Sequence, residues 1–330
     1  MNDVMIEAQG LTKIYEGTTA IENVSMQVRR GEVLGFLGPN GAGKSTTMKI
    51  LTCFTSPTAG TARVNGCDIT SDSLGVRRSL GYLPESTALY TDMLVLEYLE
   101  FAAEMRGITG EAVRKRLKAV VEETGLGDVI AKQIRALSKG YKQRVGLAQS
   151  LIHEPPILIL DEPMSGLDPN QAVEIRDLIK DIGRERTVIL STHNLAEVQV
   201  ACNRVLIISK GRIVADDTPD GLRDRAGKSR CVITVLKQPE DNFAKLCEAT
   251  LKSLPGVERA RLIEDEAGEL SFEVLPRGND DLRPVLFKAA VDRGYTLLGL
   301  LREGQNLEQV FRELTTGPSA ANSGSTKAAA

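Results

Sequence analysis

The sequence lacks the residue pattern of a metal-binding or disulfide-stabilised protein. It contains only two histidines and five cysteines, and the cysteines are scattered along the chain. No Cys-x-x-Cys pair or His/Cys cluster of the kind that holds zinc is present. Dispersed thiols in odd number are typical of a reducing compartment, where they stay buried or idle.

The sequence also lacks a long apolar run and an excess of either charge. Its longest apolar stretches, at residues 157–160 and 205–208, are far shorter than the roughly 18–20 residues that cross a bilayer. Residues 1–9 carry acids rather than a positive region followed by an apolar one, so no signal peptide is expected. The balance of 41 Lys+Arg against 44 Asp+Glu disfavours a dedicated nucleic-acid binder or a polybasic membrane anchor. We expect a soluble, cytoplasmic chain.

A length of 330 residues is enough for two domains. In the first part, short apolar and β-branched runs indicate strands at residues 33–37, 157–160, 187–190 and 204–209. Between them, helical spacing of apolar residues indicates helices at 92–106, 111–124 and 171–184, the first with Thr91 or Asp92 as its cap. Strands that alternate with helices predict an α/β fold.

A polar, charged stretch at residues 216–230 predicts a domain boundary, after which the pattern restarts. The predicted order is strand 231–236, helix 242–253, strands 257–263 and 270–275, helix 281–293 and strand 296–301. This βαββαβ order is that of a ferredoxin-like α+β domain. A short amphipathic segment follows at 306–314, and residues 317–330 are expected to be disordered.

Residues 38–46 form a phosphate-binding loop. They read Gly38, Pro39, Asn40, Gly41, Ala42, Gly43, Lys44, Ser45 and Thr46, which contains the pattern GxxxxGK[ST] between a predicted strand and a helix at 46–51. Glycines let successive backbone N–H groups turn toward a phosphate, and the helix start adds partial positive charge. We expect Lys44 to reach the β- and γ-phosphates of a bound nucleotide and the Ser45 hydroxyl to ligate Mg²⁺.

Two carboxylates follow the predicted strand at 157–160. Asp161 is placed to hold the Mg²⁺ shell beside the phosphate loop. Glu162 is placed to polarise a water toward the γ-phosphate as a general base.

Together with these motifs, residues 4–220 resemble an ABC-type ATPase, the nucleotide-binding subunit of ABC transporters. The resemblance implies that Tyr15 stacks on adenine. It further implies that Ser138 and Gly140, in the segment Leu-Ser-Lys-Gly-Tyr, match the LSGGQ signature, which contacts the γ-phosphate held by the opposite subunit. Asp168, in Ser-Gly-Leu-Asp-Pro, lies in a D-loop-like segment, and His193, in Ser-Thr-His-Asn, resembles the switch histidine that touches the γ-phosphate.

Two departures from the family pattern stand out. The signature reads Lys139-Gly140-Tyr141 where the family usually ends in Gly-Gln. Glu85 stands where most members carry the glutamine of the Q-loop, and its carboxylate can still ligate Mg²⁺ while adding negative charge near the phosphates. With both variants the sequence looks similar to bacterial export-type ATPases, including gliding-motility-associated subunits.

The resemblance implies domains at residues 1–222 (with a helical subdomain at about 86–150) and 223–316. It implies a head-to-tail homodimer that closes over two ATP molecules, peripheral on the inner face of the membrane, with residues 85–124 touching a separately encoded permease. A soluble ABC ATPase that acts on ribosomes or DNA is the alternative. Such proteins usually carry two cassettes or coiled-coil or zinc insertions, which this sequence lacks. A GTPase is disfavoured because no NKxD motif occurs.

Overall fold

The computed structural model describes residues 3–225, 230–240, 242–266, 268–278, 280–303 and 307–316. It divides into two compact units: one contains the chain up to Pro219 together with the segment from Leu314, and the other is Asp220–Glu313. The tail at 317–330, which the sequence predicts to be disordered, lies outside the described residues. Within the described ranges, no helix has the length and apolar character needed to span a membrane.

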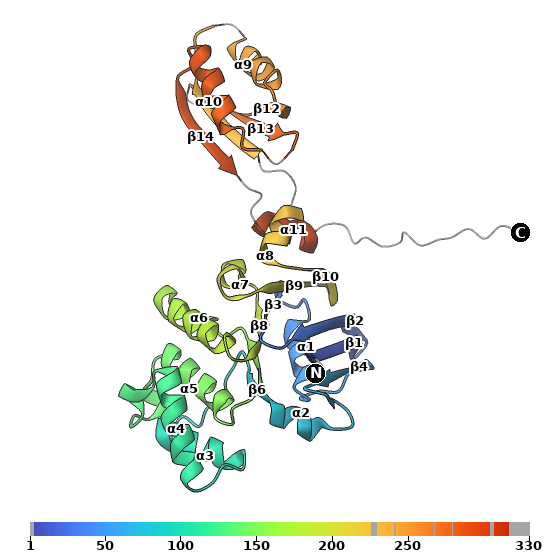
Figure 1. The fold of residues 1–330 in the computed structure, drawn as a ribbon, viewed down its shortest axis with the longest axis vertical. Coiled ribbons are helices and arrows are strands. Elements are labelled where there is room, and N and C mark those ends of the chain that lie inside the picture. The colour runs from blue at the N-terminus through green and yellow to red at the C-terminus, as the bar shows by residue number, and fades with distance from the viewer. Residues whose placement is uncertain are drawn as a thin grey trace, which may run out of the picture. The chain divides into compact units, whose positions relative to one another are not determined.

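The first unit is built on a six-stranded, mostly parallel sheet in the order β10-β9-β3-β8-β7-β6 (Figure 1). Its strands are β3 (Val33–Leu37), β6 (Leu80–Leu83), β7 (Ile157–Asp161), β8 (Thr187–Thr192), β9 (Arg204–Ser209) and β10 (Arg212–Asp217). Only the β9–β10 pair is antiparallel. Every residue of β3, β7 and β8 is buried, which explains their nearly continuous apolar sequence. The predicted α/β core is confirmed.

The central strand β8 sets the relative position of its neighbours. It pairs with β3 through Leu37 and Thr192, and with β7 through Asp161 and Ser191. Because these strands are parallel, their carboxyl ends lie at the same edge of the sheet. The loops that start at residues 38, 162 and 193 therefore leave the sheet side by side.

A second, antiparallel sheet of the first unit was not anticipated from the sequence. It contains β1 (Val4–Tyr15), β2 (Thr18–Arg29), β4 (Ala59–Val64) and β5 (Cys67–Asp68) in the order β2-β1-β4-β5. Register shifts interrupt the β1–β2 ladder, and buried and exposed residues alternate strictly only over residues 23–29 of β2. That stretch is a strand signal that the sequence analysis overlooked, whereas β1 gives only a weak one.

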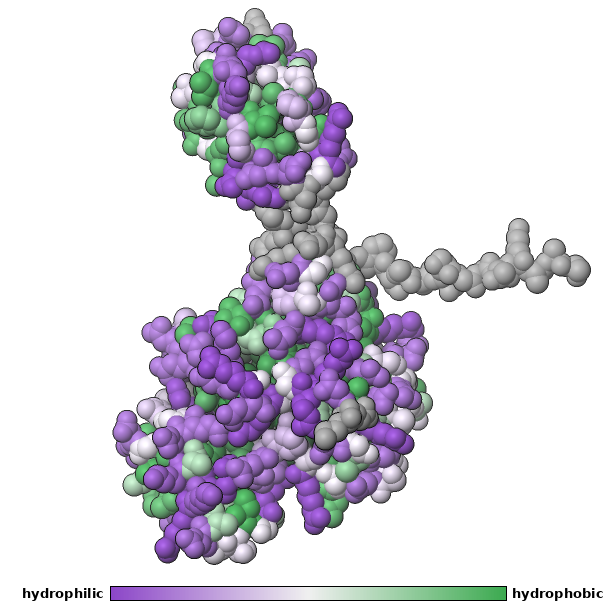
Figure 2. Space-filling view, in the orientation of Figure 1, coloured by the Kyte–Doolittle hydropathy of each residue, from purple (hydrophilic) through white to green (hydrophobic). Residues whose placement is uncertain are grey.

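Within the described part of this unit, seven α-helices accompany these sheets: α1 (Lys44–Leu51), α2 (Ser73–Ser79), α3 (Val95–Met105), α4 (Glu111–Thr124), α5 (Lys139–Leu151), α6 (Pro169–Gly183) and α7 (Leu195–Ala201). Helices α3, α4 and α5 pack on one another. A shared core joins both sheets to α1, with Ile6, Leu34 and Ile50 fully buried. The view in Figure 2 shows a mostly hydrophilic outer surface over this apolar interior.

The predicted start of α3 was wrong. The helix begins at Val95, not at residue 92, because the Leu94 backbone N–H donates to the Glu97 carboxylate at 3.0 Å and this bond closes the first turn. Asp92 lies outside the helix and pairs with Arg135 at 3.4 Å. Helix α1, in turn, begins at Lys44, two residues before its predicted start.

The second unit contains a four-stranded antiparallel sheet in the order β12-β13-β11-β14. Its elements are α8 (Pro219–Arg225, mostly in this unit), β11 (Arg230–Leu236), α9 (Phe243–Lys252), β12 (Val257–Glu266), β13 (Glu269–Pro276), α10 (Arg283–Asp292), β14 (Leu297–Glu303) and α11 (Leu307–Thr316, which crosses the division between the units). A separate core holds it together, with Phe272, Leu270 and Leu286 fully buried. On the sheet, the buried carboxylate of Glu273 accepts hydrogen bonds from Arg230 and Arg261.

His153 follows the end of α5 and has a structural role. Its Nε2 lies 3.0 Å from the Leu80 carbonyl oxygen, so this nitrogen carries the proton. Its Nδ1 is buried and has no partner among the described residues. Burial, followed by the nearby Arg106, lowers the pKa of His153 from its usual 6.5 to about 4.

This shift predicts acid sensitivity of the first unit. Because the unfolded chain takes up the proton near pH 6.5 and the folded chain only near pH 4, stability is full above pH 6.5 and falls as the pH drops through this window. After allowance for partial exposure, we expect a loss on the order of 1 kcal/mol, or about 2–4 °C in Tm. His153→Gln, which keeps an N–H donor but cannot titrate, should flatten this part of the Tm–pH curve. Parallel curves for the two proteins would contradict the assignment; His193, present in both, does not affect the difference.

Candidate nucleotide-binding site

The phosphate loop joins β3 to α1 and is held by close backbone contacts. Gly41 and Gly43 have positive φ angles of 77° and 109°. A Cβ atom on Gly38 would lie 2.5 Å from the Ile208 carbonyl oxygen, and one on Gly43 would lie 2.8 Å from that of Ala20. Glycine is therefore favoured by conformation at Gly41, by space at Gly38, and by both at Gly43.

Lys44 is buried at the start of α1 and folds back on the loop. Its ammonium donates to the Gly38 carbonyl at 2.8 Å and to the Pro39 carbonyl at 3.4 Å. The same nitrogen lies 3.2 Å from Glu162 Oε1. This is an ion-pair distance, but no aligned hydrogen bond reaches that oxygen, which is buried and has no hydrogen-bond partner among the described residues. The lysine thus connects the phosphate loop to the carboxyl end of β7.

Asp161 and Glu162 end β7 in two different environments. Asp161 is 2% exposed and accepts a hydrogen bond from the Ser191 hydroxyl at 2.7 Å, which uses one of its two oxygens. Glu162 is 7% exposed and has a φ of 49°, a left-handed conformation that non-glycine residues adopt at an energetic cost. Its backbone N–H donates to the Ser191 carbonyl at 2.9 Å, which holds the strained residue in place.

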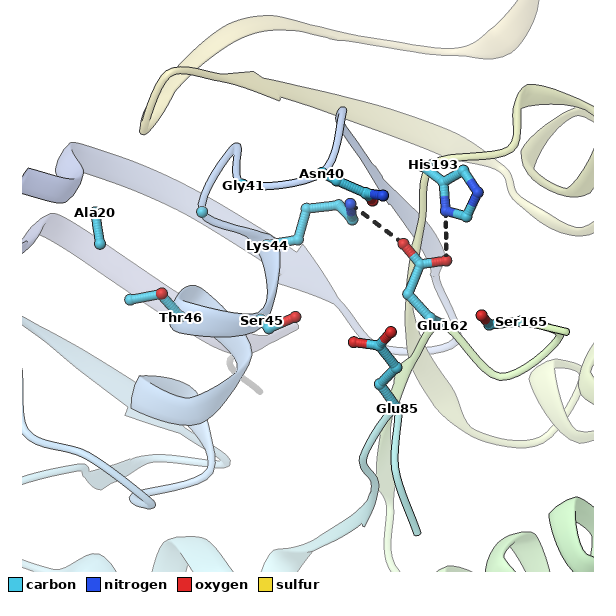
Figure 3. Close-up of a pocket in the computed structure, with 11 residues that line it drawn as sticks. Ala20, Asn40, Gly41, Lys44, Ser45, Thr46, Glu85, Glu162, Ser165 and His193 are labelled. Atoms are coloured by element: carbon cyan, nitrogen blue, oxygen red, sulfur yellow. Dashed lines mark hydrogen bonds and ion pairs between the residues drawn. The ribbon is translucent and has the colours of Figure 1, made fainter.

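His193, just after β8, contacts Glu162 from the other side. Its Nδ1 lies 2.8 Å from Glu162 Oε2 (Figure 3). Because a carboxylate can only accept, Nδ1 carries a proton and the Nε2 of a neutral ring is left as an acceptor. The imidazole side chain is about half exposed, in contrast to the buried carboxylate.

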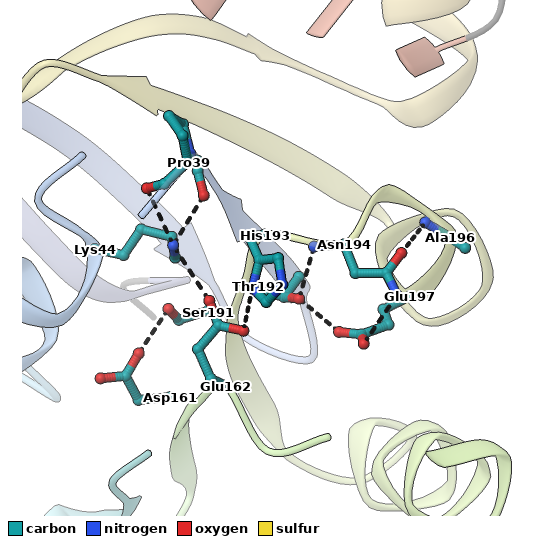
Figure 4. Close-up of polar contacts among 11 residues, drawn as sticks. Pro39, Lys44, Asp161, Glu162, Ser191, Thr192, His193, Asn194, Ala196 and Glu197 are labelled. Carbon is teal, nitrogen blue, oxygen red and sulfur yellow. Dashed lines mark hydrogen bonds and ion pairs between the residues drawn. The ribbon is translucent and has the colours of Figure 1, made fainter. Parts of the chain in front are cut away.

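A polar network behind His193 was missed in the sequence analysis (Figure 4). The Thr192 hydroxyl donates to Glu197 at 2.5 Å, and the Asn194 side-chain amide donates to the same carboxylate at 3.3 Å. Asn194 also caps α7 by accepting from the Ala196 N–H at 3.0 Å. Burial raises the pKa of Glu197, while the bond from Thr192 opposes the rise. An Asn followed three residues later by Glu is a capping signal that could have located this support.

These elements enclose a cavity of about 300 Å³. Nine of the predicted site residues line it: Asn40, Gly41, Gly43, Lys44, Ser45, Thr46, Glu85, Glu162 and His193. Ala20 and Ser165 also line it and were not anticipated. The remaining predicted residues are not among the lining residues: Tyr15, Gly38, Pro39, Ala42, Ser138, Gly140, Asp161 and Asp168.

Several of these remaining residues have evident local roles. Tyr15 ends β1, is 43% exposed, and carries the Lys13 ammonium 5.0 Å from its ring centroid. Ser138 caps α5 by accepting from the Tyr141 N–H at 3.4 Å. Asp168 caps α6 by accepting from the Gln171 N–H at 3.0 Å. The signature segment is thus outside the cavity of its own chain.

The oxygen groups near the cavity suit Mg²⁺. Ser45 and Glu85 line it, and Asp161 lies behind it with one oxygen unused. Burial, and then the charges of Asp161 and Glu85, raise the pKa of Tyr82, so both carboxylates are near this one phenol. No group of three or more His, Cys, Asp or Glu side chains that could hold a metal occurs among the described residues. Mg²⁺ does not need one, since it is usually held by one or two carboxylates with waters and phosphate oxygens.

Comparison with known proteins decides the family. The sequence profile described as "ABC transporter" matches residues 21–165. The linearmycin resistance ATP-binding protein LnrL of Bacillus subtilis (strain 168) is 30% identical over 312 residues, which cover 94% of this chain and 98% of that protein. The chain belongs to the ABC transporter ATP-binding proteins.

Two solved structures support the same conclusion for this ABC ATPase. The cbiO1 protein from Clostridium perfringens, described as part of the ABC transporter complex cbiONQ, has a TM-score of 0.62 and 30% identity, and the match covers 67% of this chain and 91% of that one. The ATP-binding cassette MJ0796, in a dimeric structure bound to ADP and Pi, has a TM-score of 0.60 and 25% identity, covering 65% and 98%. The protein is the ATP-binding subunit of an ABC transporter and hydrolyses ATP for transport.

Lys44→Ala should weaken ATP binding by a factor of about 10–100, because a charge-assisted contact to phosphate is lost. Equilibrium binding of a fluorescent ATP analogue measures this, with circular dichroism to confirm folding. Lys49→Ala removes an exposed lysine from the same helix and should leave the affinity unchanged. Normal affinity in the Lys44 variant would contradict the role of the loop.

Proposed function

We propose that the protein is the ATPase subunit of an exporter, and that two copies close head-to-tail over two ATP molecules while a separate permease spans the membrane. The name of LnrL, a resistance protein, supports the export direction. The likeness to gliding-motility-associated subunits stays a prediction, and such a role would use the same transporter biochemistry.

One observation carries the dimer. The cavity is lined by the phosphate loop, Glu85, Glu162, Ser165 and His193, while the signature residues Ser138 and Gly140 of the same chain are absent from its lining. Ser138 is exposed, so a second copy can present it to the open side of the cavity. A two-fold symmetric pair completes both sites in the same way.

Each residue then has a role in hydrolysis. Lys44 exchanges its carbonyl partners for β- and γ-phosphate oxygens. Glu162 accepts a hydrogen bond from the attacking water and takes its proton as general base, a role that fits Oε1, which accepts no hydrogen bond among the described residues. His193 holds the Glu162 carboxylate and turns its free nitrogen to the γ-phosphate region.

The remaining positions bind the nucleotide. Ser45, Asp161 and Glu85 would hold Mg²⁺, which when bound neutralises charge on the phosphate oxygens. Tyr15 stacks on adenine with the ring face that Lys13 does not occupy. Asp168 and the D-loop-like segment connect the two sites across the dimer.

Glu162→Gln should bind ATP, lose hydrolysis by at least about 100-fold, and accumulate as an ATP-dependent dimer, because the base is lost and the geometry kept. Adding Ser138→Arg should abolish that dimer by placing a bulky cation in the interface. Size-exclusion chromatography with multi-angle light scattering, with and without ATP, measures both. Unchanged turnover in Glu162→Gln removes it from the base role, and a dimer that survives Ser138→Arg refutes the shared site.

An exposed apolar group supports contact between residues 85–124 and a permease. Tyr90 is 59% exposed and Met105 71% exposed, and the Tyr90 ring meets that of Phe101 edge-to-face at 5.7 Å. Leu96, also on α3, is 39% exposed. Apolar groups of this kind on a hydrophilic surface are typical of interaction sites.

Purification of the tagged protein from native membranes should bring down an integral membrane protein. Met105→Glu should reduce its recovery at least threefold with basal ATPase activity retained, because a charge is placed on the apolar surface. Leu246→Glu, the same kind of change at an exposed leucine of α9, is the matched control. Recovery of ribosomes or DNA in place of a membrane protein would favour the alternative function.

We also propose domain limits of 1–222, with a helical subdomain at about 86–150, and 223–316. The β-α-β-β-α-β order of the second unit and its sheet order β12-β13-β11-β14 support a ferredoxin-like arrangement. Its acidic and basic residues are interspersed, so we assign it to stabilisation and additional dimer contact.

A further inference from the structure

The residues that line the cavity include two carboxylates, Glu85 and Glu162, but only one cation, Lys44. Lys44 is the only lysine or arginine among the lining residues, and it is paired with Glu162. Glu85, which lines the same cavity, is exposed and has no ion pair or hydrogen bond in the part of the chain that the structure describes. An ATP molecule would bring further negative charge, so a cation beyond Mg²⁺ and Lys44 would stabilise the nucleotide-bound site.

An unpaired cation occurs in the signature segment. Lys139, the first residue of α5, is exposed and has no carboxylate partner among the described residues. Its ammonium lies over the D-loop-like segment of its own chain: a Cβ atom on Gly166 would be only 2.3 Å from Lys139 Nζ. Gly166 has a φ of 67° and no side chain, which leaves this space open.

The backbone at Lys139 is held in place by the residues before and after it. Ser138 caps the helix. Gly140 is buried against α6, where an added Cβ would lie 2.8 Å from the Gln171 side chain. The backbone position of Lys139 is therefore set by packing, while its long, rotatable stem can still move the charge.

We propose that Lys139 of one copy binds the γ-phosphate in the site of the other copy and offsets the charge of Glu85 there. The inference rests on the proposed head-to-tail dimer. The two departures from the family pattern then form a complementary pair, since a carboxylate replaces an amide on one wall and an ammonium replaces a glycine on the other. In a water-excluded site such a cation stabilises charge on the transferred phosphoryl group far more than it would in water.

Three substitutions test the role in turnover. Lys139→Met should lower kcat at least tenfold, Lys139→Arg should restore at least a third of the rate, and Lys180→Met, at an exposed position near the end of α6, should have no effect. An effect of Lys139→Met equal to that of Lys180→Met overturns the proposal.

A double-mutant cycle tests the pairing with Glu85. In a Glu85→Gln background the loss from Lys139→Met should shrink at least threefold, because there is less charge to offset. Equal losses in the two backgrounds would show that the two residues do not interact.

Mixed dimers distinguish action across the interface from action within one chain. Purified heterodimers, selected by two tags, carry Lys44→Ala on one copy and Lys139→Met on the other, or both changes on one copy. Action across the interface leaves one intact site only in the first arrangement, which should be the faster by at least threefold. Equal or reversed rates overturn the proposal, and reversed rates would identify Lys139 as a support for its own D-loop-like segment.

The Glu162→Gln variant keeps this test separate from that of the proposed function. If it forms no dimer with ATP, the dimer itself fails. If it dimerises and Lys139→Met behaves as Lys180→Met does, only the role of Lys139 fails.

Discussion

The site depends on the contact between Lys44 and Glu162. It joins two segments more than a hundred positions apart in the chain, one at the start of α1 and the other at the end of β7. Both side chains are less than a tenth exposed, and a buried ion pair of this kind is costly unless each partner has other contacts. Lys44 has two carbonyl oxygens and Glu162 has His193, so the pair is supported from both ends. A phosphate that enters the cavity competes with these contacts, so nucleotide binding can change the arrangement of Lys44 and Glu162.

The strained backbone conformation of Glu162 also depends on contacts with β8. A non-glycine residue with positive φ persists only where its surroundings hold it, and here the Ser191 backbone does so. Ser191 also binds Asp161 through its hydroxyl. One residue of β8 therefore positions both carboxylates. Of the next two residues, Thr192 binds Glu197 and His193 binds Glu162.

Much of the nucleotide-binding site could be predicted from the sequence because its main parts have short, recognisable residue patterns. The phosphate loop, the acidic end of β7 and His193 each have a fixed residue pattern after a buried strand, and these are the residues that the structure brings together. The network of Thr192, Asn194 and Glu197 was missed because its residues are individually common and act only through mutual contact. In the β1–β2 sheet the irregular β1 gives a weak strand pattern, and the regular alternation at residues 23–29 of β2 was overlooked. Helix α3 was placed too early because Glu97, not Asp92, closes its first turn. The contact of Lys139 with Gly166 depends on how α5 and the segment after β7 pack, which no local pattern encodes.

The parallel register of β8 has a consequence for how the chain tolerates insertions. Successive residues in a strand are about 3.3 Å apart, so one residue inserted within β8 would move Ser191 and Thr192 away from Asp161 and Leu37 and turn alternate side chains to the opposite face. The turn before it, at residues 184–186, carries no such constraint, because its length does not alter which residues face each other across the sheet. Insertions and deletions among related chains should therefore occur in that turn and not within β8.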